Sequence, residues 1–179
     1  GWNDSDENGD DPSIYSVAVV DVEFSPNFDM DDSIICMSNG FPTGEMTPLP
    51  YLQSGIWESG GAWNGEAGFS AAVQITSEGD ELQTLPGIKS MGIALPDDYD
   101  GTDPGARNVY LYVDAFNTVT DSVGGFVFIC EDGSLSMRCG PSGDPILASI
   151  DVHGDADTCK AMVGTRLGWE NTLSEEWGP

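Results

Sequence analysis

The chain has 179 residues, and its 31 acidic residues against five Lys and Arg give a formal net charge of −26. Nucleic-acid backbones and anionic lipid surfaces are bound by clustered Lys and Arg, so we expect no nucleic-acid partner and no membrane insertion. The apolar runs are also shorter than the ~18 residues that a membrane span needs. The composition therefore favours cations, neutral ligands or protein partners.

The acidic composition also indicates a habitat. Dense acid with little lysine keeps a protein hydrated and soluble where salt screens its self-repulsion, since the Debye length falls to about 3 Å at 1 M ionic strength. We therefore expect a halophilic protein from a saline or marine setting. An acidic secreted protein from an ordinary habitat is the alternative.

Cysteine usage points to the compartment. The cysteines are even in number and lack C-x-x-C spacing, which predicts two disulfides rather than a metal site. Disulfides persist in oxidising surroundings, so we expect an extracellular location, with any leader or anchor already removed before Gly1. The sequence leaves the connectivity open among Cys36, Cys130, Cys139 and Cys159.

The first 13 residues are almost wholly polar and acidic, and by themselves they bury too little surface to fold. They match the first half of a calcium-binding loop, in which alternate oxygen ligands converge on a hard cation. The candidate ligands are Asp4, Asp6, Asn8 and Asp10. Tyr15 stands where an EF-hand has its twelfth-position Glu, so we expect a looser calcium loop, with a disordered acidic tail as the alternative.

A strand is predicted over residues 14–24. Both faces of its first half are apolar, and Asp21 and Glu23 end one face. This alternation is typical of a central strand whose far end reaches water. The strand could equally be inserted into a neighbouring subunit, where main-chain hydrogen bonds supply affinity. Behind the tail at 1–13 we expect one β-sandwich domain over 14–179.

A segment rich in glycine and proline runs from Ser38 to Gly68, and loops that long are uncommon without a function. Its aromatic residues Tyr51, Trp57 and Trp63 could stack on sugar rings or fill a pocket of a partner, as exposed aromatics do at binding sites. Alternatively, they fold back and cap the core of the domain.

Apolar runs predict further strands along the chain, at 69–76, 88–95, 108–116, 125–130, 135–139, 146–152 and 161–169. No window of a dozen residues shows a helical period. About eight or nine short strands with glycine-rich connections predict an all-β fold, an antiparallel β-sandwich or jelly roll with one long Gly/Pro/Trp-rich loop.

The dipeptide Asp132–Gly133 stands between two of these runs and is a strong signal for a two-residue hairpin turn. That turn pairs Cys130 with Leu135 and sets Cys139 opposite Phe126. The two cysteines are then about 13 Å apart along the ladder, too far for a bridge. Either the turn is wider or the disulfides are long-range.

Three neighbouring segments form a recognisable pattern. Residues 87–101 run from a strand into the turn Leu-Pro-Asp-Asp-Tyr, and residues 109–116 and 124–129 are strands joined by a polar loop. The pattern resembles a β-sandwich in structural proteins of tailed viruses, of the virion or tail-fibre type. The resemblance covers residues 87–129, includes no catalytic motif, and implies a virion or other extracellular assembly.

Acidic turns at 29–32 and 97–103 are further candidates for ion binding. Asp is also common in turns because its side chain accepts local N–H bonds, which is the alternative here. His153 lies among aspartates and could be a metal ligand or a base, but one histidine does not build a typical zinc site. A surface histidine among acids would show the same pattern.

Motifs of the common enzyme classes are missing, since the sequence has no G-x-S-x-G elbow, phosphate loop or H-E-x-x-H. Paired carboxylates could hydrolyse glycosides, but no pair stands out among so many acids. We therefore expect a non-enzymatic structural subunit of an extracellular assembly, a virion surface component or a filament, stabilised by Ca²⁺. Its partners would be copies of itself or other subunits. The alternative is a secreted carbohydrate-binding or adhesive module that binds glycans; a secreted hydrolase comes third.

The large negative net charge makes the stability of the protein in salt a test of the halophilic assignment. If the acidic surface is an adaptation to brine, the melting temperature should rise clearly between low and molar NaCl, because added salt screens the repulsion among carboxylates. Thermal unfolding followed by circular dichroism measures this. A melting temperature that is flat or falls over the range would contradict the saline assignment.

Overall fold

The structure is a computed structural model that describes residues 14–42, 49–58, 62–64, 73–75, 88–117, 122–139, 146–165 and 173–174. Within these ranges the chain is almost wholly antiparallel β-sheet, with twelve strands and one helical turn. The predicted all-β, antiparallel fold class is confirmed. The tail at 1–13 lies outside the described residues.

The strands form three sheets. The first has the order β1-β2-β3-β4, with β5 also paired to β3, and consists of β1 (Ile14–Phe24), β2 (Ser33–Pro42), β3 (Leu49–Glu58), β4 (Ala62–Asn64) and β5 (Val73–Gln74). The central sheet consists in order of β6 (Ile88–Ala94), β7 (Asn108–Asn117), β8 (Ser122–Glu131) and β9 (Ser134–Cys139). The third consists of β10 (Leu147–His153), β11 (Lys160–Thr165) and β12 (Leu173–Ser174). The helical turn α1 (Phe28–Asp31) connects β1 to β2.

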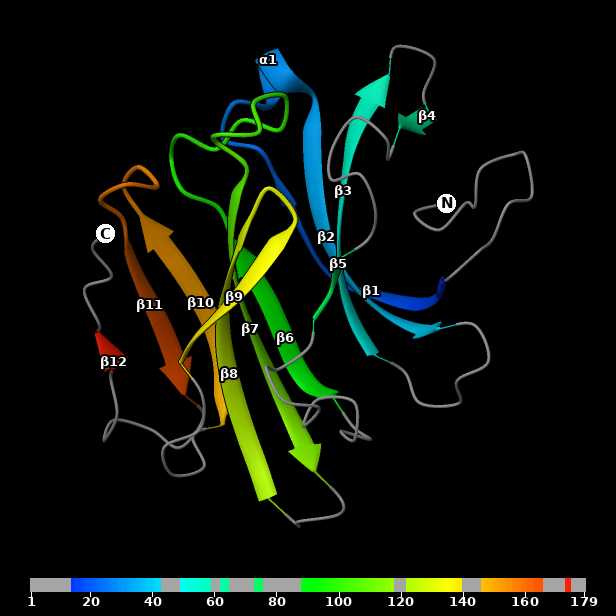
Figure 1. Cartoon of the computed structure of the whole chain (residues 1–179), viewed down its shortest axis with the longest axis vertical. Helices are drawn as coiled ribbons and strands as arrows, with labels where there is room; N and C mark the ends of the chain where they lie inside the picture. The colour runs from blue at the N-terminus through cyan, green and yellow to red at the C-terminus, as the bar shows by residue number, and fades with distance from the viewer. Residues whose placement is uncertain are drawn as a thin grey trace.

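The three sheets stack as layers, with the central sheet between the other two (Figure 1). Strand β7 shows why. Val109, Leu111 and Val113 belong to the core shared with the first sheet, whereas Tyr110 and Tyr112 belong to the cores shared with the third. A strand that is buried on both faces has a continuous apolar sequence rather than an alternating one. The sequence predicted a sandwich, and the structure adds a third layer to it.

Two apolar layers hold the sheets together. The larger lies between the first and central sheets and includes Ile35, Met37, Leu52, Ile75, Met91, Ile93, Leu111 and Phe128. The smaller lies between the central and third sheets and includes Ala94, Tyr110, Val127, Ile129, Leu147, Val152 and Ala161. Full burial of one large aliphatic or aromatic side chain contributes about 1.5–3 kcal/mol, so the central sheet gains from both layers.

Strand β3 occupies the middle of the segment that the sequence predicted as a long loop. It pairs with β2 from Leu49 to Ile56, and Leu52 is fully buried in the larger apolar layer. Glycine and proline lower the strand propensity of this segment, but pairing and burial outweigh that preference. The expectation of one loop from 38 to 68 is therefore wrong at residues 38–42, 49–58 and 62–64, which belong to β2, β3 and β4.

Strand β1 has the predicted range but not the predicted position. Among the described strands it is the outermost of the first sheet and pairs with β2 alone, so the expectation of a central strand is wrong. Register shifts between Ser16 and Ala18 and between Val19 and Asp21 interrupt its ladder. Bulges of this kind are common in edge strands, because they twist the strand and so hinder pairing with other chains.

The hairpin at Asp132–Gly133 is confirmed. Both turn residues have positive φ, 45° and 82°, as a two-residue type I′ turn requires. Cys130 pairs with Leu135 as predicted, whereas Cys139 pairs with Val127, one residue from the predicted partner. A register shift in the ladder beside Val127 causes the difference, because it adds a residue to β9.

The cysteines differ from the disulfide prediction. Cys36, Cys130 and Cys159 are free thiols and all are buried. Cys130 lies in the larger apolar layer and Cys159 in the smaller one, so the central sheet separates their side chains. On β2, the Cys36 Sγ donates to Gln53 Oε1 at 3.7 Å. Two disulfides would need all four cysteines, and the described three do not form them.

The thiols can be counted directly. Alkylation of the denatured, unreduced protein should label at least the three described cysteines. Burial raises the pKa of Cys36 to about 12 and that of Cys130 to about 11, so these thiols should resist iodoacetamide in the native protein at about pH 8. Mass spectrometry before and after denaturation measures both quantities. Absence of labelling after denaturation would restore the disulfides.

Candidate functional site: the acidic end and the apolar edge

Three aspartate-rich connections meet at one end of the molecule, at the top of Figure 1. They are the α1 segment (25–33), the β6–β7 loop (95–107) and the β10–β11 turn (154–159), and together they are called the acidic end here. Hydrogen bonds run from one connection to the next. The acidic end therefore contains both aspartate clusters that the sequence indicated as candidate ion ligands.

Asp31 is the centre of this network and is only 4% exposed. Its Oδ2 accepts hydrogen bonds from Ser25 Oγ at 2.6 Å and from the Gly101 N–H at 2.9 Å. Its Oδ1 accepts a bond from the Ser33 N–H at 3.0 Å. A buried carboxylate is costly unless donors surround it, and here they come from both sides of α1 and from the β6–β7 loop. This side chain therefore fastens the loop to the first sheet.

Tyr99 strengthens the same attachment from the side of the loop. Its ring is fully buried in the larger apolar layer, and its backbone carbonyl accepts a bond from Asn27 Nδ2 at 2.9 Å. Burial raises the pKa of its phenol well above the usual range. Gly101 packs so closely on Ser33 that a Cβ would clash with that side chain. Tyr99 and Gly101 thus anchor the otherwise exposed β6–β7 loop to the core and to the first sheet.

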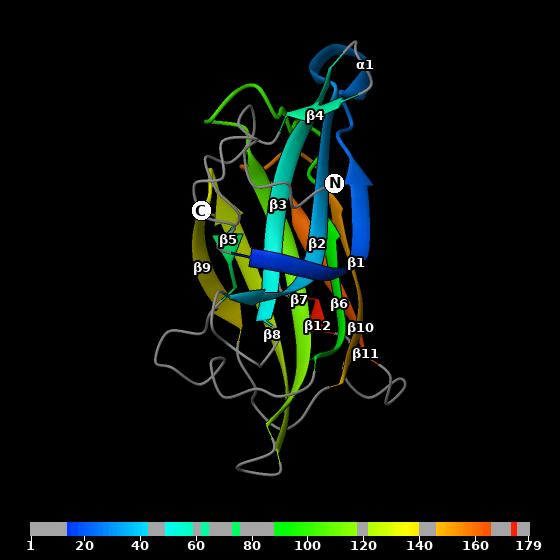
Figure 2. The same cartoon turned by 90° about the vertical axis from the view of Figure 1, so that its right-hand side faces the viewer.

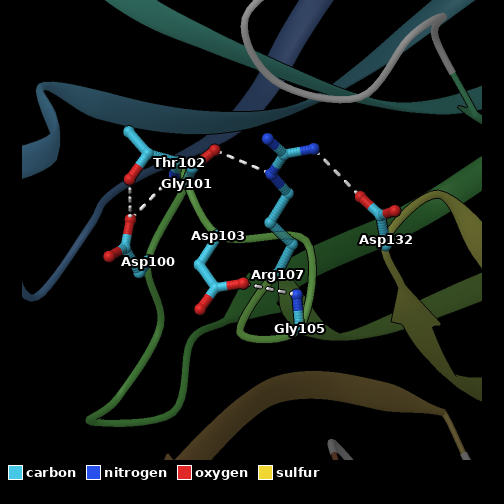
Figure 3. Close-up of polar contacts among 7 residues, drawn as sticks. All are labelled: Asp100, Gly101, Thr102, Asp103, Gly105, Arg107 and Asp132. Carbon is cyan, nitrogen blue, oxygen red and sulfur yellow. Dashed lines mark hydrogen bonds and ion pairs between the residues drawn. The ribbon is translucent and has the colours of Figure 1, made fainter.

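Other carboxylates of the β6–β7 loop stabilise the loop itself (Figure 3). Asp100 Oδ1 accepts bonds from the Thr102 Oγ1 at 2.6 Å and the Thr102 N–H at 2.8 Å, which lower the pKa of that carboxyl. Asp103 Oδ1 accepts a bond from the Gly105 N–H at 2.9 Å. Both aspartates therefore act as turn residues.

Arg107 connects this loop to the β8–β9 hairpin (Figure 3). Its Nε donates to the Gly101 carbonyl at 2.7 Å, and its guanidinium forms an ion pair with Asp132 Oδ1 at 3.0 Å. The Asp132 N–H donates in turn to the Arg107 carbonyl at 3.1 Å. One basic side chain thus holds two connections of an acidic surface together.

Asp97 and Asp98 connect the β6–β7 loop to the β10–β11 turn. Asp97 Oδ2 accepts a bond from the Gly154 N–H at 3.2 Å, and the Asp97 N–H donates to the Gly154 carbonyl at 3.0 Å. Asp98 Oδ1 accepts a bond from the Ala156 N–H at 2.8 Å. These bonds link the central and third sheets at the acidic end.

The carboxylates at 97, 98, 100 and 103 are therefore engaged by backbone N–H groups, which is the structural alternative to ion binding. Over the described part of the chain, no group of three or more His, Cys, Asp or Glu is arranged to hold a metal ion. His153 and the aspartates near it are exposed, as a surface histidine would be. The calcium ligands proposed at Asp4, Asp6, Asn8 and Asp10 lie outside the described residues.

The aromatic residues of the predicted binding loop lie on β3 and β4. Tyr51 lies on β3, is only 2% exposed, and has a raised phenol pKa because of burial. It is therefore unable to stack on a sugar, and its assignment as a ligand-binding residue is corrected. Trp57 and Trp63 are direct register partners between β3 and β4. The fold thus brings these two residues together from either side of a short connection.

A second candidate site follows β1. Val19, Val20, Val22 and Phe24 are 42%, 48%, 41% and 57% exposed, and Met30 of the neighbouring α1 is 80% exposed. These five residues are called the apolar edge here. The second half of the strand runs along the right-hand border of the molecule in Figure 2, after its first half has crossed the front of the view. The sequence contained its signal, an apolar run on both faces, but that run is equally typical of a central strand.

Asp21 attaches the apolar edge to the central sheet. Its Oδ2 accepts a bond from the Ile93 N–H of β6 at 2.9 Å, and its Oδ1 accepts one from the Val22 N–H at 3.0 Å. Burial, followed by the charges of Asp21 and Asp151, raises the pKa of Glu23. The edge therefore combines exposed apolar side chains with a negative potential.

Comparison with protein-family models, curated proteins and solved structures gives no match to this chain. Among the residues that the structure describes, no helix has the length and hydropathy needed to cross a membrane. Function is accordingly inferred from the acidic end and the apolar edge.

The Asp31 network can be tested by one substitution. Asp31→Asn should lower the free energy of unfolding by about 3 kcal/mol, because Asn offers a single acceptor oxygen to the donors that converge there. Asp32→Asn is the matched control, since Asp32 is exposed and its left-handed backbone (φ 50°) suits Asn. The control should stay within about 0.5 kcal/mol. Equal effects in urea unfolding would contradict the role given to Asp31.

Proposed function

We propose that this chain is a non-enzymatic structural subunit of an extracellular assembly, a virion surface component or a filament, whose subunits join through the apolar edge. The observation that carries the proposal is the exposure of large apolar side chains on the outermost strand of the first sheet. An edge strand offers unpaired backbone groups, and a strand from another subunit can pair with them.

The balance of features along β1 favours a partner. Soluble proteins protect their edge strands with bulges and charges, and β1 has both. It nevertheless leaves Val19, Val20, Val22 and Phe24 about half exposed. Covering the exposed part of each side chain would contribute roughly 1 kcal/mol, to which main-chain hydrogen bonds add. The bulges and charges then limit unspecific pairing, and the apolar residues stabilise the specific contact.

The other candidate groups support a structural role. The carboxylates at 97, 98, 100 and 103 accept backbone hydrogen bonds, and Asp31 is surrounded by donors. The thiols of Cys36 and Cys130 are buried with raised pKa values, so they are poor nucleophiles. These five aspartates thus contribute to the fold, and these two thiols are shielded, which supports a structural role.

The extracellular part of the proposal rests on the acidic composition and on the resemblance of residues 87–129 to structural proteins of tailed viruses. In this fold those residues form β6, β7, most of β8 and the loop fastened by Asp31. The free thiols remove the disulfide argument for an oxidising compartment.

A secreted carbohydrate-binding or adhesive module is the second candidate. The register pairing of Trp57 with Trp63 favours it, since two aromatic residues on neighbouring strands can contact one sugar chain. The burial of Tyr51 removes one of the three aromatic residues on which this candidate first depended.

The proposal predicts self-association of the whole chain. Light scattering after size exclusion, together with electron microscopy, should show particles or polymers, and Val22→Lys should return the protein to monomers because it charges the apolar edge. Met162→Lys is the matched control, since Met162 is 52% exposed on β11, away from that edge. A parent protein that stays monomeric at every concentration would contradict the proposal, and glycan binding by that monomer would favour the second candidate.

A further inference from the structure

Strands β1 and β9 lie on opposite sides of the molecule. β1 ends the first sheet and contacts β6, whereas β9 ends the central sheet at the edge away from β6. Figure 2 shows them at the two lateral borders, β1 on the right and β9 on the left. Within the described residues, each strand pairs with one neighbour in its sheet, β2 and β8 respectively. The described strands therefore include two separated edges to which a strand can be added.

The two edges differ in charge. Residues 19–24 of β1 contain Asp21 and Glu23, and Asp151 of β10 adds to the negative potential there. β9 has the sequence Ser-Leu-Ser-Met-Arg-Cys, with one basic residue, Arg138, and no acidic residue. The acidic residue of the adjoining turn, Asp132, is already paired with Arg107. In a chain of net charge −26, β9 is the edge that can best approach an acidic strand.

Length also favours β9 as the partner. β9 has six residues, which matches the six residues from 19 to 24, whereas β4 has three and β12 has two. Main-chain hydrogen bonds supply affinity in strand addition, so a longer ladder is more stable. Pairing of β1 with β1 of a second copy would bring Asp21 and Glu23 of both copies to one ladder, where like charges are destabilising.

We propose that residues 19–24 of β1 in one copy pair with β9 of the next copy, so that the copies join head to tail. The inference rests on the proposed function and names the surface that the apolar edge binds. Two different surfaces meet, so one end of each oligomer keeps a free β1 and the other a free β9. Such a contact repeats without limit unless its rotation closes a ring, and the expected product is a filament.

Mixing of single-edge variants tests this pairing. Val22→Lys blocks β1 and leaves β9 unchanged, and Arg138→Glu reverses the charge of β9 and leaves β1 unchanged. Each variant alone should be monomeric at about 0.15 M NaCl, where charges still act over about 8 Å. An equimolar mixture should form a dimer of one copy of each, because a single productive junction remains. Native mass spectrometry distinguishes this dimer by the masses of the two variants.

The outcomes separate the inference from the function on which it rests. A parent protein that is always monomeric overturns both. A parent that assembles, with Arg138→Glu assembling like the parent, overturns the β1–β9 pairing and leaves the proposed function standing. Assembly lost in both variants but not restored as a dimer in the mixture also overturns the pairing.

Folding of each variant is checked by circular dichroism and thermal unfolding before mixing. If Val22→Lys is unfolded, Val20→Lys replaces it, because Val20 has no register partner on β2, at the shift between Val19 and Asp21, and is 48% exposed. The matched control is a double variant that carries both Met162→Lys and Arg138→Glu, so that a lysine is added away from β1. Mixed with Val22→Lys, it should form a dimer as Arg138→Glu does.

Discussion

The central sheet is apolar on both faces, and in water it is stable only when another element covers each face. Strand β7 makes the constraint plain, because Leu111 and Tyr112 are adjacent in sequence and buried on opposite sides. The first sheet covers one face and the third sheet covers the other (Figure 1). The connections at the acidic end then have to join three layers, which explains why so many of their polar groups bond to a neighbouring connection instead of to water.

Aspartate carries most of those bonds. Its short side chain reaches backbone N–H groups in tight turns, so an acidic chain has suitable acceptors wherever a connection bends. Asp31 has the largest role because it is buried and bonds to residues on both sides of α1 and to the β6–β7 loop. The chain has few basic side chains, and one of them, Arg107, joins the β6–β7 loop to the β8–β9 hairpin. At the acidic end the carboxylates of Asp31, Asp97 and Asp98 therefore join the connections to one another.

The apolar edge shows a different use of the same charge. The Asp21 carboxylate accepts a hydrogen bond from the Ile93 N–H, which holds β1 beside the central sheet, and Glu23 lies among like charges. Unspecific pairing with another acidic strand is thereby opposed, while a neutral or basic strand could still approach the exposed valines. Repulsion between two acidic surfaces would not prevent association through one edge, because burial of apolar side chains acts at short range, once two strands are in contact.

The sequence by itself determined the all-β class, most strand ranges, the hairpin at Asp132–Gly133 and the acidic surface, since alternation and turn chemistry are local properties. For the aspartates at 97–103 it indicated two roles, ion binding or the stabilisation of turns. Tertiary structure decided the third layer, the place of β3 inside an expected loop, and the edge position of β1. It also decided that Asp31 is the buried carboxylate at the centre of the hydrogen-bond network, and that Cys130 and Cys159 lie on opposite faces of the central sheet. These features depend on which strands become neighbours across sheets, and apolar runs of similar composition leave that choice to long-range packing.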